Sequence, residues 1–258
     1  MKRLVLIWAA LMIALGPMRA DASEIMVSAA MSLLGALEQI AREFEARTPG
    51  ARVTLNFSSS GALRQQIEAG APVDVFASAS ERHMDILESA GLVEAGTRRS
   101  FARNAIVMAM PVGSPAPDGF RHLADSSIER IAMGNPATSP AGQYAHDALV
   151  SMGLWDEVRP KLVYAETVRQ VLDYLVRAEV DAGLLYATDA ALLPGAVRVA
   201  ATAPEGSHAP VVYPVAVLLG SAEKELARAF VEFLAESGVA REALRAAGFA
   251  LPGAGGHE

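Results

Sequence analysis

The residues best placed to bind a ligand are serines that follow predicted strands at the starts of predicted helices. Between Val53 and Ser78, an alternating strand ends in Ser58-Ser59-Ser60, and a short helix and a buried strand follow. A helix start offers backbone N–H groups without intrahelical partners, and the helix dipole is positive there. With hydroxyl donors beside them, these groups form a binding site for an anion. A lone Ser60 would more simply cap its helix.

Three further segments combine a predicted strand, a loop of small or polar residues and a helix start. Ser32 precedes apolar residues at helical spacing, so we expect it at an N-cap. Pro140 fits the first helical turn, where its missing N–H costs nothing, and it leaves the amide of Ala141 free. The apolar spacing after Thr167 predicts a helix with free amides near Val168. This repetition favours an anion site over independent helix caps.

Strands and helices alternate along the chain, and the pattern of the first half returns in the second. Apolar or alternating runs predict strands at 25–29, 53–57, 73–77, 105–110, 130–133, 162–164, 182–186, 197–202 and 213–219. Helical spacing predicts helices at 33–44, around 63–67, and at 81–90, 141–152, 168–177, 222–234 and 239–246. This length and alternation predict one large or two medium α/β domains.

The composition excludes several classes of function. The chain of 258 residues contains no cysteine, so it has no disulfide, thiolate nucleophile or cysteine-bound metal. Its formal net charge is -7, and loss of residues 1–22 removes three basic residues and one acidic residue, which gives -9. An acidic chain without a basic run argues against nucleic acid or an anionic membrane surface as a partner. Any bound anion must therefore be held by local geometry.

Residues 1–22 have the features of a secretion signal peptide. Two basic residues precede an apolar run from Leu4 to Leu15, and small residues suitable for cleavage follow, ending at Ala22. The apolar run of about 12 residues is shorter than the about 20 that span a bilayer. We therefore expect an exported mature chain that begins at Ser23.

Motifs along nearly the whole mature chain occur in one order that is found in a known family. The string Gln66-Ile67-Glu68-Ala69-Gly70-Ala71-Pro72 is specific, whereas the serine motif by itself is not. The other matching segments are 29–33, 59–61, 134–136 with 140–142, 165–169, 183–186 and 213–217. In these motifs the chain resembles the periplasmic molybdate-binding proteins of ABC importers, which are type II periplasmic binding proteins.

The resemblance implies a two-lobed α/β protein in the periplasm. Each lobe is expected to be a mostly parallel sheet flanked by helices, with the ligand in the cleft between the lobes. Lobe I would comprise residues 23–103 plus 206–258, and lobe II residues 104–205.

The resemblance also implies a site for molybdate or tungstate, with no cofactor. Ser32 and Ser60 match two serines that donate hydroxyl and backbone N–H groups, and both belong to the expected lobe I. Ala141 and Val168 match donors of backbone N–H, and Tyr186 matches a phenol donor; these three belong to the expected lobe II. Molybdenum would be held as an oxyanion, with no metal ion ligated directly. The remaining tyrosines are expected to serve packing: Tyr144, Tyr164, Tyr174 and Tyr213.

A lining of neutral donors suits a dianion. Burial of the charge is costly unless every oxygen finds donors, and each charge-assisted bond contributes about 1.5–3 kcal/mol. Arg64 and Arg169 lie close to the matched positions, and we interpret both as solvated or structural. A protonated phosphate would leave its proton unpaired, because the nearest carboxylate, Asp74, is interpreted as a loop cap. Sulfate carries no such proton, so this argument does not exclude it.

Three alternatives belong to other classes or ligands. A secreted hydrolase would need an organised nucleophile, but there is no Gly-x-Ser-x-Gly elbow and the histidines have no recognisable orienting partner. A zinc or manganese capture protein is disfavoured because the histidines lack paired ligand spacing. A binding protein for sulfate or another tetrahedral oxyanion stays open. The histidines in question are His83, His122, His146, His208 and His257.

The predicted mechanism is capture by closure of the lobes over one oxyanion. No bond is made or broken, so we expect no enzymatic activity. The expected partner is an inner-membrane molybdate ABC permease, and the protein is expected to be a monomer without a nucleic acid partner.

Overall fold

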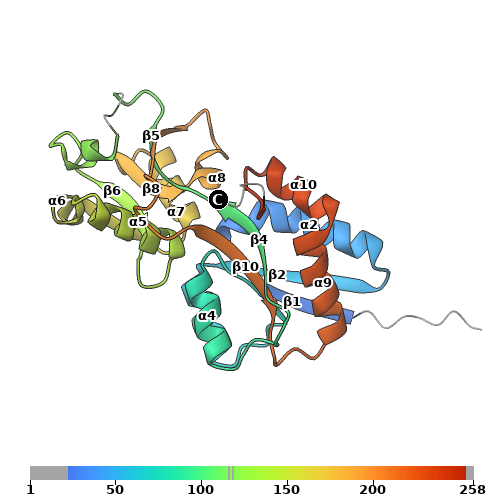
Figure 1. Cartoon of the computed structure of the whole chain (residues 1–258). Helices are drawn as coiled ribbons and strands as arrows, with labels where there is room; N and C mark the ends of the chain where they lie inside the picture. Colours follow the sequence, from blue (N-terminus) through green and yellow to red (C-terminus); the bar gives the residue numbers. More distant parts are fainter. Residues whose placement is uncertain (1–22, 116, 118, 254–258) are drawn as a thin grey trace, which may run out of the picture.

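The computed structural model describes residues 23–115, 117 and 119–253, so the predicted signal peptide lies outside the described residues. The described chain forms two five-stranded sheets, with helices packed on each (Figure 1). Among these residues, we find no helix with the length and apolar character needed to cross a membrane.

The first sheet and its helices form the unit that we call lobe I. Its strand order is β2 (Ala51–Ser58), β1 (Ser23–Ala30), β3 (Val75–Ala77), β10 (Val211–Val217) and β4 (Arg99–Asn104). The helices of lobe I are α2 (Leu34–Arg47), α3 (Ser60–Glu68), α4 (Glu81–Ser89), α9 (Lys224–Glu236) and α10 (Gly238–Ala246). A 3-10 turn, η1 (Met31–Leu33), joins β1 to α2.

The second sheet and its helices form lobe II. Its strand order is β7 (Leu162–Ala165), β6 (Ile131–Gly134), β8 (Ala182–Tyr186), β5 (Ile106–Pro111) and β9 (Val197–Thr202). The helices of lobe II are α5 (Pro140–Ser151), α6 (Trp155–Val158), α7 (Val168–Val176) and α8 (Ala187–Ala190), with the 3-10 segments η2 (Gly119–Ala124) and η3 (Arg159–Lys161). The predicted two-lobed α/β architecture is confirmed.

In each sheet four strands run in one direction and one strand is reversed. β10 is antiparallel to β3 and β4, and β5 is antiparallel to β8 and β9, whereas the other neighbouring strands are parallel. The reversed strands follow from the two crossovers. Because β4 ends beside lobe II and the chain continues through Ala105 into β5, β5 enters its sheet from the edge where the other strands end. The return from β9 to β10 has the same effect on lobe I.

The reversed strands lie deep in the core. Every residue of β10 is buried, and β5 is buried from Ile106 to Met110. Helices cover the sheets with the faces that the spacing predicts. α2 buries Ala36, Leu37, Ile40, Ala41 and Phe44, and the Phe44 ring packs edge-on against Phe230 of α9, with 5.3 Å between the ring centroids. Burial of this apolar surface is the main stabilising contribution in a chain without disulfides.

The main departure from the predicted elements is β4. Only Phe101 and Ala102 are buried in this edge strand, and its other residues are polar or charged. Its polar sequence shows no apolar alternation. Its extended conformation comes from pairing with β10 and from a bridge between Arg103 and Ala250, which no local pattern predicts.

Candidate functional site

One pocket lies where the two lobes meet, at the carboxyl ends of strands from both sheets. All five residues predicted to bind the ligand line it: Ser32, Ser60, Ala141, Val168 and Tyr186. The cavity between the lining residues measures about 10 Å³, far less than pockets for drug-sized ligands need. The pocket therefore suits a small ion.

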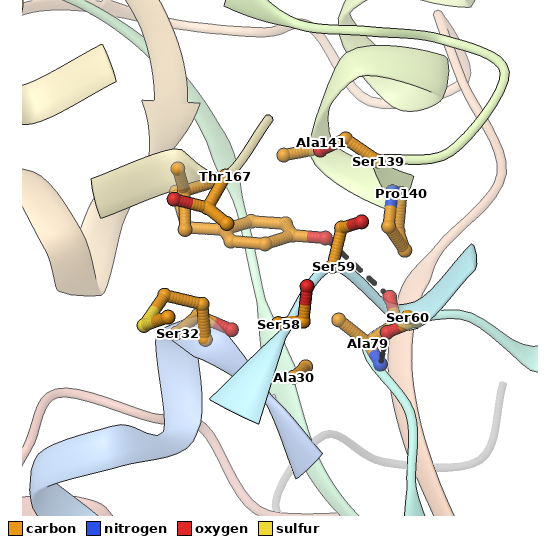
Figure 2. A pocket seen from close by; sticks show the side chains of 13 residues that line it. Ala30, Ser32, Ser58, Ser59, Ser60, Ala79, Ser139, Pro140, Ala141 and Thr167 are labelled. Atoms are coloured by element: carbon orange, nitrogen blue, oxygen red, sulfur yellow. Dashed lines mark hydrogen bonds between the residues drawn. The ribbon is translucent and has the colours of Figure 1, made fainter. Parts of the chain in front are cut away.

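Figure 2 shows how segments far apart in the sequence converge on this pocket. Lobe I contributes the end of β1 with η1, the three serines where β2 ends and α3 begins, and Ala79 after β3. Lobe II contributes the first residues of α5, Thr167 with Val168 at the start of α7, and Tyr186 at the end of β8.

Ser32 does not cap a helix, so the N-cap prediction for this residue is wrong. It lies inside η1, and α2 begins only at Leu34, with Leu33 at its N-cap position. The Ser32 hydroxyl instead lies 3.0 Å from the hydroxyl of Tyr213. The reason is tertiary: the fully buried Tyr213 of β10 places its hydroxyl within reach of Ser32 and offers the serine a partner.

Ser60 is the first residue of α3, and Ser59 occupies the N-cap position without a side-chain cap. The simple capping role of Ser60 is therefore wrong as well. Its buried Oγ accepts a hydrogen bond from the backbone N–H of Ala79 at 3.0 Å. Because Oγ acts as the acceptor in that contact, the hydroxyl proton can be donated to a guest in the pocket.

The two helix starts of lobe II have the predicted form. Pro140 is the first residue of α5, and Oγ of the N-cap residue Ser139 accepts from the Gly142 amide at 3.5 Å. Oγ1 of Thr167 caps α7 by accepting from the Gln170 amide at 3.3 Å. The first amides of each helix, which include those of Ala141 and Val168, have no intrahelical acceptor.

Tyr186 ends the buried strand β8 and is only 1% exposed. Its hydroxyl donates to the backbone carbonyl of Ala79 at 3.4 Å, and this weak bond joins lobe II to lobe I. Its ring lies 5.9 Å from that of Tyr213. Burial raises the pKa of Tyr186 well above its ordinary value, so the phenol keeps its proton and acts as a donor at neutral pH.

The charged groups near the pocket are used elsewhere. Arg64 donates to Glu68 at 2.6 Å on the side of α3, and neither residue lines the pocket. Arg169 lies 3.8 Å from the buried Asp189, whose pKa burial raises to about 7 while the guanidinium opposes that shift. Among the residues that the structure describes, the pocket lining contains no charged side chain.

Asp74 also has a structural role. It precedes β3 at the edge of the sheet away from the pocket, where Oδ2 accepts from the Met26 amide at 2.7 Å. Its Oδ1 accepts from Ser221 at 2.6 Å. Within the described residues, no group of three or more histidine, aspartate or glutamate side chains could hold a metal ion.

Sequence reasoning assigned Tyr213 to packing and missed its hydroxyl. Besides Ser32, this hydroxyl contacts the Asn104 side-chain amide at 3.2 Å, and the same amide reaches Thr188 of lobe II at 2.8 Å. Asn104 ends β4 at the first crossover. A tyrosine in an apolar strand has no local signal for such a role, because its partners come from other strands.

Comparison with known proteins agrees with this geometry. A family model described as bacterial extracellular solute-binding protein matches residues 25–250. The chain belongs to this family. The molybdate-binding protein ModA of Haemophilus influenzae is 37% identical over 257 residues, which cover 96% of this chain and 99% of that protein. The family predicted from the sequence motifs is therefore confirmed.

Solved structures of solute-binding proteins give the same fold. The Azotobacter vinelandii periplasmic molybdate-binding protein matches with a TM-score of 0.78 at 27% identity, over 88% of this chain and 99% of that one. The sulfate-binding protein SubI of Mycobacterium tuberculosis matches with a TM-score of 0.79 at 16% identity, over 90% of this chain and 88% of that one. The second likeness shows the fold alone, so the fold does not distinguish the two anions.

Proposed function

We propose that this solute-binding protein captures molybdate outside the cytoplasm and delivers it to an ABC permease in the inner membrane. The observation that carries the proposal is the lining of the pocket. Residues with hydroxyl groups and residues at helix starts line it from both lobes, and none of its lining residues among those described carries a charged side chain. The identity to ModA over nearly the whole chain supports molybdate as the anion.

The proposed ligand contacts are the two serine groups, the two helix-start amides and the phenol of Tyr186. Ser32 and Ser60 would donate from lobe I, and Ala141, Val168 and Tyr186 from lobe II. A tetrahedral dianion presents four oxygens in different directions, so donors fixed on opposite walls satisfy them better than a single mobile ammonium group would. Tungstate has the same shape and charge and belongs to the proposal.

The proposed mechanism is reversible closure without covalent chemistry. The open form would bind the anion on one lobe, and the second lobe would then complete the donor set. The closed form of a monomer would be recognised by the permease. The protein would make and break no bond, so it would not be an enzyme.

A calorimetric titration with molybdate, tungstate, sulfate and phosphate under matched conditions tests the proposal. We expect tight binding of molybdate and tungstate, weaker binding of sulfate, as the identity to ModA implies, and no binding of phosphate at neutral pH, because its proton would be left unpaired. Tighter binding of sulfate than of molybdate would show that the protein belongs to a sulfate importer instead.

A further inference from the structure

Beside the pocket, a hydrogen bond between backbone atoms joins the two lobes. The amide of Gly61, the second residue of α3, donates to the carbonyl oxygen of Thr138 in lobe II at 2.9 Å. The residues next to this bond, Ser60 and Ser139, both line the pocket. Farther along the same side, Arg82 of α4 hydrogen-bonds to Gln143 of α5.

No side chain fits at position 61 in this arrangement. A Cβ atom added to Gly61 would lie 2.8 Å from Cα and 2.9 Å from the carbonyl carbon of Thr138, and still closer to its oxygen. The atoms that it would meet belong to the backbone, so they cannot turn aside as the end of a flexible side chain would. The lobes would have to separate to admit it.

The glycine is not required by the conformation of α3. Gly61 lies within the helix and is not one of the glycines with positive φ. In a helix interior glycine costs up to about 1 kcal/mol relative to alanine, so the helix gives no reason to prefer glycine at this position. Its advantage must come from the contact with Thr138.

We infer that Gly61 is a closure residue for the anion pocket. The missing side chain lets the start of α3 reach the loop before α5, and this approach brings Ser60 and Ala141 to opposite sides of one small pocket. Gly61 would therefore control affinity because it lets the lobes come together, and it would donate no side-chain hydrogen bond to the ligand. The inference rests on the proposed function.

The test compares Gly61→Ala with Gly35→Ala. Gly35 also lies in the first turn of a lobe I helix without positive φ, and nothing lies within 4 Å of its added Cβ. For Gly61→Ala we expect at least a tenfold loss of molybdate affinity and a smaller contraction in solution X-ray scattering on addition of molybdate. The unfolding temperature without ligand should equal or exceed that of the wild type. Gly35→Ala should bind and contract as the wild type does.

A second variant, Gly142→Ala, distinguishes an effect on closure of the lobes from a loss of stability within one lobe. Its added Cβ would press on the carbonyl group of Gly134 in the same lobe, so this variant should unfold at a lower temperature even without ligand. Wild-type affinity and contraction in Gly61→Ala would overturn the inference, and so would a loss of ligand-free stability like that of Gly142→Ala. Failure of the wild type to bind molybdate would instead refute the proposed function, and this inference with it.

Discussion

The proposed donors at the pocket are neutral groups that neighbouring residues hold in place. The Ser60 hydroxyl is fixed by Ala79, the Ser32 hydroxyl lies against Tyr213, and burial keeps Tyr186 protonated. Burial likewise raises the pKa of Tyr213, so its hydroxyl stays neutral beside Ser32. Because these oxygen atoms are already held at the pocket, only their hydroxyl protons would have to turn when an anion enters, and such preorganisation would favour tight binding.

Ser60→Ala should weaken molybdate binding by about tenfold or more, because one charge-assisted hydrogen bond is lost in a buried pocket. Isothermal titration calorimetry measures this change. Arg64→Gln is the matched control in the same helix, since Arg64 pairs with Glu68 and does not line the pocket. A hundredfold loss in the control would show that a cation holds the anion's charge.

At the scale of single elements, helix starts do most of the positioning. α5 and α7 each begin directly after a residue at the pocket whose side chain caps the helix. α3 begins at Ser60, whose hydroxyl accepts a hydrogen bond from the Ala79 amide. The helix dipoles of α3, α5 and α7 therefore place partial positive charge around one small volume without a formal charge.

Thr167→Ala should disturb the start of α7. Loss of the cap to the Gln170 amide should lower the free energy of unfolding by about 1 kcal/mol. It should also weaken molybdate binding, because the Val168 amide that follows the cap is no longer held in place. Chemical denaturation and calorimetry measure the two effects. Thr167→Ser keeps a hydroxyl cap and should restore both, and a failure to restore them would point to the lost methyl group instead.

The buried His83 of α4 should make the free energy of unfolding depend on pH. It is buried, and burial, together with the charges of Arg64 and Arg82, lowers its pKa from 6.5 to about 4. His83 therefore takes up a proton near pH 6.5 in the unfolded chain but only near pH 4 in the folded chain. The free energy of unfolding should consequently fall as pH drops from about 6.5 to about 4.

Urea denaturation at pH 7 and pH 5 measures the effect of His83. His83→Gln should show a smaller difference between the two pH values than the wild type, whatever its stability at pH 7. An equal difference in both proteins would assign the pH dependence to other groups.

At the scale of the whole molecule, the pocket exists only when the lobes are together. Lobe II contributes the starts of α5 and α7 and the end of β8, whereas lobe I contributes the serines and Ala79. The crossovers at Ala105 and between Thr202 and Val211 join the lobes without covering the pocket. A ligand that contacts both lobes should therefore stabilise the closed form and the folded state together.

Saturation with molybdate should raise the unfolding temperature. Ligand at about 1,000 times its dissociation constant contributes about 4 kcal/mol, which corresponds to roughly 8 to 16 °C for a chain of this size. Differential scanning calorimetry measures the shift, and sodium chloride at equal ionic strength is the control. An unchanged unfolding temperature at saturating molybdate would contradict the proposed function.

The sequence by itself determined the alternation of strands and helices, the helix starts at Pro140 and Val168, and the family, because these depend on local spacing and on ordered motifs. Only the tertiary structure decided that β4 forms, that Ser32 meets Tyr213, and that Gly61 reaches Thr138. Each of these contacts joins segments distant in the chain. Local propensity does not encode such contacts, since they form only when packing of the sheets and lobes brings the partners together.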